Sequence, residues 1–258
     1  MSINKKRVGS DRDRMSTLDK AEARALADQE QSKETLSSEI RDRVFDLAGP
    51  FAAQTSELAK AYSLRRKLVE VVRDQTAEVS LCVRHGWTSL ENFRERRHLD
   101  GGFMEHYRLP GDGGRPKVVG PDRWVQVGKG MVKGDAEAAA AGYPTMQNPS
   151  AAELAEFLDG LKEAILAADQ ADHAYQMVQK TSQAMRERVD ALIQDMSEYL
   201  RFVFINETAS ARRRQMRKFG FRFVGVGAAE EDAEDGEEVE SIGLEAAAAA
   251  QASGVQLV

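Results

Sequence analysis

Cysteine and proline are both scarce in this chain of 258 residues. Cys82 is the single cysteine, which excludes an internal disulfide bond and a cysteine metal cluster. The chain has 6 prolines, and none lies between Pro50 and Pro110 or after Pro149. Because proline interrupts helices, these two proline-free stretches are where long helices are expected.

Aromatic residues make up only 7% of the chain, and no run approaches 18 apolar residues. The sequence therefore predicts no transmembrane helix. Residues 1–14 are basic but lack an apolar core, so we expect no secretory signal. We expect a cytoplasmic protein, and we leave open a virus particle or another assembly as its place of action.

Acidic and basic residues are unevenly distributed along the chain. The net charge is −6, yet residues 228–258 contain nine acidic residues and no Lys or Arg, so residues 1–227 have a net charge of +3. The acidic segment also contains the low-complexity run Ala246–Ala250. Such a composition does not support a packed core, and we predict a disordered acidic tail.

Motifs for catalysis, metal binding or nucleotide binding are missing. His98, Asp100 and His106 lie near one another in sequence, but without the tight spacing of metal ligands on one helix. Lys129 lies in a Gly-Lys-Gly sequence and is not followed by the Ser or Thr that a phosphate loop requires. The glycine-rich run 111–116 does not match the phosphate-loop motif either. We predict no catalytic residue, no metal and no cofactor, and therefore no enzyme.

The clearest helical signal runs from Ser150 to about Phe204. Ser150-Ala-Ala-Glu153 has the form of a capping box, and apolar residues then recur at spacings of three and four. A helix of about 50 residues is about 75 Å long, which predicts a rod that packs on other rods. The candidate seam and oligomer contacts are Leu154, Leu158, Leu161, Ile165, Met185, Val189, Leu192, Met196 and Tyr199.

The same periodicity predicts helices over residues 33–48 and 51–85, with Gly86 as a natural stop. We interpret Gly49-Pro50 as a kink or a very short turn between them. Residues 1–32 have almost no apolar stripe and are predicted to be a polar, partly disordered extension. Residues 99–148 are rich in glycine and proline and are predicted to be an irregular insertion.

A basic-aromatic segment lies within residues 211–226, with six cations between residues 212 and 222. Ionic docking within or between chains, a solvated surface, a nucleic-acid contact and a membrane contact are alternative interpretations, with docking favoured. The candidate contacts are Arg212, Arg213, Arg214, Arg217, Lys218, Phe219, Phe221 and Arg222.

Polar residues also interrupt the apolar stripe of the long helix. Asp172 and Ser182 lie at or near core positions. Buried polar groups of this kind fix register or oligomeric state in helical bundles, whereas an exposed local break is the alternative. The sequence leaves both open.

Together these patterns predict a mainly α fold, an elongated bundle of coiled-coil-like long helices with a Gly/Pro-rich excursion and an acidic tail. Two main helices cannot bury such a stripe alone, so we expect a homo-oligomer, with a protein partner as a further option. The favoured function is a non-enzymatic structural or assembly protein. A nucleic-acid-binding accessory protein is the alternative, and an enzyme or metal protein using residues 99–148 is the third hypothesis.

Overall fold

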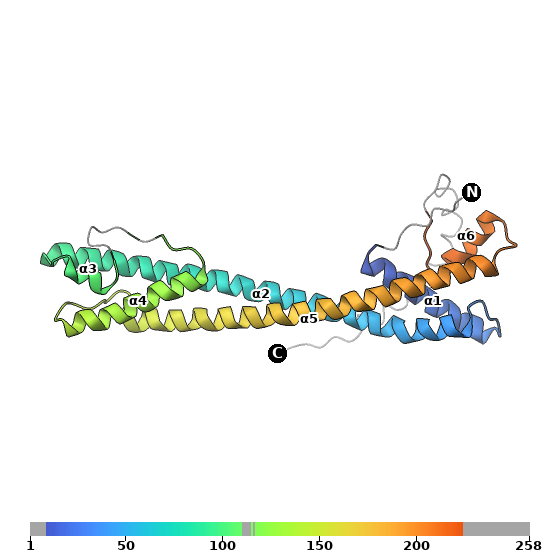
Figure 1. Cartoon of the computed structure of the whole chain (residues 1–258), viewed down its shortest axis with the longest axis horizontal. Helices are drawn as coiled ribbons and strands as arrows, with labels where there is room; N and C mark the ends of the chain where they lie inside the picture. The colour runs from blue at the N-terminus through green and yellow to red at the C-terminus, as the bar shows by residue number, and fades with distance from the viewer. Residues whose placement is uncertain (1–8, 110–114, 116, 224–258) are drawn as a thin grey trace, which may run out of the picture. The chain divides into compact units, whose positions relative to one another are not determined.

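The computed structural model describes residues 9–109, 115 and 117–223. Its helices are α1 (Asp11–Glu30), α2 (Ser38–Arg97), α3 (Gly102–His106), α4 (Pro121–Ala140), α5 (Ala151–Val203) and α6 (Ala209–Arg217). The long helices α2 and α5 pack together, and no strand forms among these residues (Figure 1). The predicted mainly α fold is therefore confirmed. The predicted acidic tail and the glycines at 111–114 lie outside the described residues.

The chain divides into two compact units. The first unit comprises Met1–Ala53 and Ala184–Val258, and the second comprises Gln54–Gln183. Helices α2 and α5 each contribute one part to both units.

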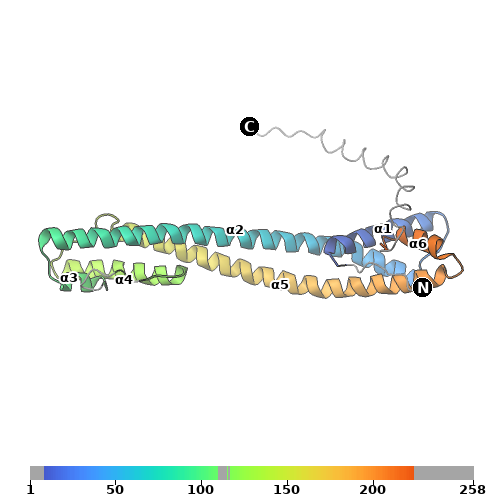
Figure 2. The same cartoon turned by 90° about the horizontal axis from the view of Figure 1, so that it is seen from above.

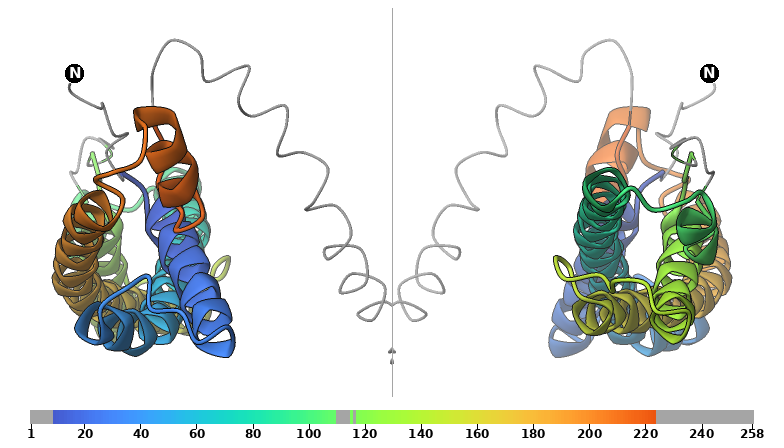
Figure 3. Two further views of the ribbon diagram at one scale, coloured as in Figure 1. Left: turned by 90° about the vertical axis from the view of Figure 1, so that its right-hand side faces the viewer. Right: turned by 90° about the vertical axis from the view of Figure 1, so that its left-hand side faces the viewer.

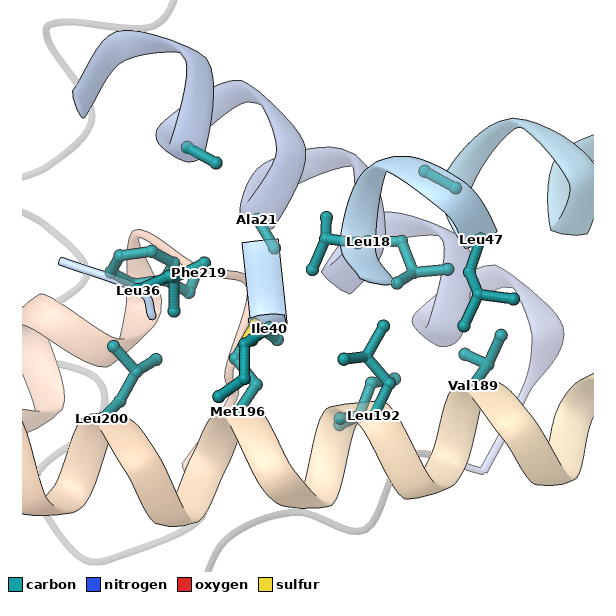
Figure 4. Close-up of a cluster of buried hydrophobic side chains, with 14 of the residues drawn as sticks. Leu18, Ala21, Leu36, Ile40, Leu47, Val189, Leu192, Met196, Leu200 and Phe219 are labelled. Atoms are coloured by element: carbon teal, nitrogen blue, oxygen red, sulfur yellow. The ribbon is translucent and has the colours of Figure 1, made fainter. Parts of the chain in front are cut away.

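The first unit is built around an apolar core shared by α1, α2, α5 and α6. Leu192 and Met196 of α5 are fully buried there, beside Leu18 of α1 and Val44 of α2. Figure 4 shows side chains of α1, α2 and α5 meeting in one interior with Phe219, which follows α6, and the left panel of Figure 3 shows the four helices grouped around it. The shorter helices therefore cover the apolar stripe of the long helices in this unit.

Helix α1 differs from the predicted polar extension. It begins at an N-cap, since the Ser10 side chain accepts a hydrogen bond from the backbone of Asp13. Leu18, Ala21 and Ala25 are buried on one face. The short alanines gave the sequence a weak apolar signal, but they let α1 pack closely on its neighbours.

The second unit packs α3 and α4 onto parts of α2 and α5. Trp87 of α2 lies beside Trp124 of α4, with ring centroids 6.3 Å apart. The same core contains Phe103 of α3 and Leu158 of α5. Figure 2 shows α4 running beside the long helices, and the right panel of Figure 3 shows this unit end-on.

The predicted helix boundaries at Gly49-Pro50 and at Gly86 are wrong, because α2 continues through both; a turn at Gly49-Pro50 is therefore excluded, and a kink there stays a prediction. Pro50 lies inside the helix, which continues through Gly49-Pro50. Pro50 is exposed, while Leu47 and Phe51 on either side are buried in the first core. Gly86 is likewise helical, and a Cβ at this position would lie 2.7 Å from Met131 Cε. Packing holds the helix at the first position, and the Met131 side chain of α4 lies against the glycine at the second.

The Gly/Pro-rich region is more regular than the sequence suggests. Helix α4 begins with Pro121 at its first turn and passes through Gly128, Gly130 and Gly134. A Cβ at Gly134 would lie 2.3 Å from the backbone oxygen of His106. Gly128 and Gly134 permit close packing of α4, whereas a Cβ at Gly130 would meet its nearest neighbour only at 3.6 Å. All three lie inside the helix and form neither a turn nor a phosphate loop.

The predicted start of the second long helix is confirmed. The backbone N–H of Ser150 donates to Glu153 Oε2 (2.9 Å), and the backbone N–H of Glu153 donates to Ser150 Oγ (3.2 Å). This reciprocal pair is a capping box. The backbone hydrogen bond from Ser150 also lowers the pKa of Glu153.

Candidate functional site

Residues 54–78 of α2 and 161–182 of α5, here called the two-helix stretch, form an antiparallel pair within the second unit. Gln54 bonds to Ser182, and Arg65 pairs with Asp172. Residue numbers therefore increase along α2 in the direction in which they decrease along α5, which makes the pair antiparallel. The seam residues of α2 are Gln54, Leu58, Ala61, Arg65, Leu68, Val72 and Gln75, and all are partly buried.

The partner positions on α5 repeat with the same spacing. They are Leu161, Ala164, Ala168, Ala171, Tyr175, Val178 and Ser182, and every one is buried or partly buried. Both series follow the alternating three- and four-residue steps by which paired helices keep one stripe in contact.

Polar layers interrupt this seam at two levels. Gln54 Nε2 donates to Ser182 Oγ (3.1 Å) and to the backbone oxygen of Val178 (3.3 Å). Ser182 is only 4% exposed. A buried polar pair of this kind is stable in one register only, because a shift leaves both groups without a partner.

The second polar layer combines charge with aromatic rings. Arg65 forms an ion pair with Asp172, and its guanidinium carbon lies 5.2 Å from the centre of the Tyr175 ring. Tyr62 packs against the same ring at 5.9 Å. Asp172 therefore has a partner within the chain. The sequence analysis identified Asp172 and Ser182 as polar residues in the apolar stripe but missed their partners Gln54 and Arg65. The spacing of Leu58, Ala61 and Leu68 is the signal that places both partners on the seam.

The two-helix stretch buries unusually little of its own apolar surface. No described residue of α2 from 52 to 78 is buried, and Ala171 is the single buried residue of α5 from 165 to 181. Large apolar side chains are correspondingly exposed: Tyr62 51%, Leu64 53%, Val69 54%, Leu166 59% and Met177 56%. Exposed apolar side chains gathered in one region mark interaction surfaces more often than isolated ones do.

The predicted seam residues fall into both units. Leu154, Leu158 and Leu161 are buried in the second core, and Ile165 packs against it. In the first unit, Val189, Leu192 and Met196 are fully buried, with Met185 and Tyr199 packed beside them. These side chains are covered by helices of the same chain, and Leu161 and Ile165 also belong to the two-helix stretch.

The basic-aromatic segment is partly built into the first unit. Arg212 donates from Nε to the backbone oxygen of Phe204 (3.0 Å) and from Nη2 to that of Ile205 (2.9 Å), which satisfies carbonyls at the end of α5. Phe219 and Phe221 are 1% and 2% exposed. Arg222 pairs with Asp13 at 3.2 Å. Arg214 and Lys218 are exposed, and Arg213 and Arg217 are partly buried.

No group of three or more metal-ligating side chains occurs within the described ranges. Asp100 Oδ1 accepts hydrogen bonds from the backbone of Phe103 (3.3 Å) and from Tyr143 (3.2 Å), so this carboxylate supports the turn into α3. Burial raises the pKa of the Cys82 thiol, with Glu78 and Glu153 adding to the effect, which disfavours the nucleophilic thiolate.

A cavity of about 270 Å³ lies between α4 and α5 in the second unit. Its floor is apolar, with Val132, Ala155 and Leu158, and its edge carries Lys129 and Lys133. Lys162 and Asp159, also at this edge, form an ion pair with each other. The cavity thus presents solvated cations around an apolar floor and lacks a nucleophile paired with a base.

No helix in the described part of the chain is both long and apolar enough to cross a membrane. No protein-family model, no curated protein and no solved structure matches the sequence or the fold.

Proposed function

We propose that this chain is a non-enzymatic structural or assembly protein, a helical subunit that associates with further copies of itself. The observation that carries the proposal is the two-helix stretch, where Leu64, Val69 and Met177 are each more than half exposed. Two helices alone cannot remove these side chains from water. A coiled-coil-like association of copies would bury them, at about 25 cal/mol for each Å² of apolar surface.

The disposition of polar groups supports a structural role. The most regular polar layers, Gln54 with Ser182 and Arg65 with Asp172, fix how helices pair. In the first unit, Arg14 and Arg186 bind acidic side chains on other helices. Charged residues therefore stabilise helix packing in both units. We propose that the subunit acts in the cytoplasm or in a larger assembly.

The aromatic side chains that the nucleic-acid alternative uses are buried in this arrangement. Bases stack on exposed rings, but Phe219 and Phe221 lie in the first core. Arg212 and Arg222 are occupied by backbone carbonyls and by Asp13. Docking of the segment onto its own chain is the interpretation that these contacts favour.

Light scattering after size exclusion tests the proposal. We expect a discrete mass at a multiple of 28.5 kDa, independent of added nucleic acid. A mass of 28.5 kDa at every concentration, together with binding to nucleic acid that weakens steeply with salt, would instead support the accessory-protein alternative.

A further inference from the structure

The outward side of α6 carries exposed basic residues and is here called the α6 cation face. Met216 is buried in the first core, and Arg214 and Lys218 lie two positions before and after it. Lys218 keeps helical backbone angles, with φ −62° and ψ −23°. Because two residues turn a helix by about 200°, both basic side chains point away from the core. Both are exposed, and neither forms an ion pair with another described residue.

Acidic residues do not balance this charge within the segment itself. Residues 208–223 contain six Lys or Arg and no Asp or Glu. Arg212 donates to backbone carbonyls, which carry no net charge, whereas Arg222 pairs with Asp13. The α6 cation face therefore favours an anionic partner.

The chain itself contains such a partner a few residues further on. Eight acidic residues and no Lys or Arg lie between Glu230 and Glu240, here called the acidic segment. Glu230 comes seven residues after Phe223, the last residue that the structure describes. Seven residues of extended chain span about 24 Å, and Lys218 is five residues before Phe223, at most about 17 Å away. The acidic segment can therefore reach the α6 cation face.

We infer that the acidic segment docks on the α6 cation face of its own chain. Charge complementarity selects this pairing, since eight acidic residues meet a segment with six basic residues and no acidic one. The short connection also holds the acidic segment near α6 at an effective concentration of about a millimolar. Docking within one chain is thus favoured over docking between copies. The contact is independent of the self-association proposed above.

A second group of cations occurs at the start of the chain, where residues 5–7 are all basic. This group has three cations, half as many as residues 208–223, and Asp11 and Asp13 follow it closely. The cations of α6 are also held on a formed helix, which reduces the entropy lost on binding. The α6 cation face is therefore the stronger site for the acidic segment.

Paramagnetic relaxation in the full chain tests the contact. Cys82 is replaced by Ser, and Gly236→Cys carries a nitroxide label within the acidic segment. At low salt we expect the label to broaden the amide signals of residues 214–218. This broadening should fall about threefold or more at about 0.5 M salt, where the Debye length is about 4 Å. The double variant Arg214→Glu with Lys218→Glu should lower it to a similar extent at low salt.

Lys33→Glu is the matched control for Lys218→Glu, because each variant replaces an exposed lysine of the first unit. Lys218→Glu alone should lower the broadening, and Lys33→Glu should leave it unchanged. Broadening that persists in the double variant, or that Lys33→Glu lowers equally, overturns the inference. A larger loss on reversing the charges of Lys5 and Lys6 also overturns it, because the acidic segment would then bind the start of the chain. The salt dependence of the wild-type α6 tests the contact without any substitution there.

Isotope mixing separates docking within a chain from docking between copies. Chains that carry the nitroxide at natural isotopic abundance are mixed with ¹⁵N-labelled chains that lack it. We expect residues 214–218 of the ¹⁵N-labelled chains to show no broadening in this mixture. Broadening as strong as in the singly prepared chain would place the acidic segment on another copy and contradict the inference. Light scattering judges self-association separately, so the two proposals can fail independently.

Discussion

At the scale of single residues, several glycines of this chain lie at helix contacts and do not end helices. Gly86, Gly128 and Gly134 lie inside helices, where an added Cβ would meet Met131, Leu158 and the backbone of His106. From the sequence alone Gly86 is a helix stop, because the helix α4 that packs beside it is distant in sequence. Such contacts are set by tertiary packing, which local sequence patterns do not contain.

Two glycines of α4 give a direct comparison. Gly134→Ala should lower the free energy of unfolding by about 2 kcal/mol or more, because the backbone oxygen at 2.3 Å cannot move aside without shifting α3. Gly130→Ala, with its nearest neighbour at 3.6 Å, should raise the same free energy by about 0.5–1 kcal/mol through helix propensity. Urea unfolding measures both. A shift of both variants in the same direction would argue against close packing of α3 on α4.

A buried carboxylate provides the second test at this scale. Asp135 Oδ1 accepts hydrogen bonds from Tyr107 Oη (2.8 Å) and from the backbone N–H of Met146 (2.6 Å). Asp135→Ala leaves both donors unsatisfied and should cost about 1–3 kcal/mol for each. Tyr107→Phe removes one donor only and should cost less, about 1 kcal/mol.

Unfolding of these two variants followed by tryptophan fluorescence is informative, because Trp87 and Trp124 belong to the same unit. Burial and the bond to Asp135 both raise the pKa of Tyr107. Its phenol should therefore titrate only at high pH together with unfolding, and a normal tyrosine titration in the folded protein would contradict the buried pair.

At the scale of helices, the sequence predicted the long elements better than the short ones. The capping box at Ser150 and the apolar repeat of α5 are local signals, and the structure agrees with both. The continuity of α2 through Pro50 was not predictable, because burial of Leu47 and Phe51 holds the helix together there. For the candidate site, Asp172 and Ser182 were visible as interruptions, but their partners Gln54 and Arg65 required the pairing of two distant segments.

Ion pairs join α1 to α5 beside their shared apolar core, so the stability of this contact should depend on pH. The hydrogen bond from Arg186 lowers the pKa of Asp11 below its ordinary value of 3.8, and Arg14 adds to the effect. Since the folded pKa is lowered, this stabilisation is complete above pH 3.8 and is lost as the pH falls through the folded pKa. Asp11→Asn should destabilise the first unit by about 1–2 kcal/mol at neutral pH and weaken its acid sensitivity.

Thermal melts between neutral pH and pH 2 measure this effect. Asp74→Asn is the control, because Asp74 is 69% exposed and pairs with the neighbouring Arg73. Equal acid sensitivity in wild type and D11N would show that this ion pair does not hold α1.

At the scale of the whole molecule, the two units differ in how completely they cover their own apolar surface. In the first unit α1 and α6 bury the stripe that carries Leu192 and Met196. In the second unit α4 packs near Leu158, and the two-helix stretch leaves Leu64, Val69 and Met177 exposed. The sequence predicted an apolar surface in excess of what two helices bury, and the structure shows which part of the chain carries it.

Hydrogen exchange over a range of protein concentrations tests the central claim most directly. If copies associate through the two-helix stretch, amides of residues 54–78 and 161–182 should exchange more slowly as concentration rises, while the buried core around Leu192 stays unchanged. Exchange in the two-helix stretch that is the same at every concentration would contradict the account.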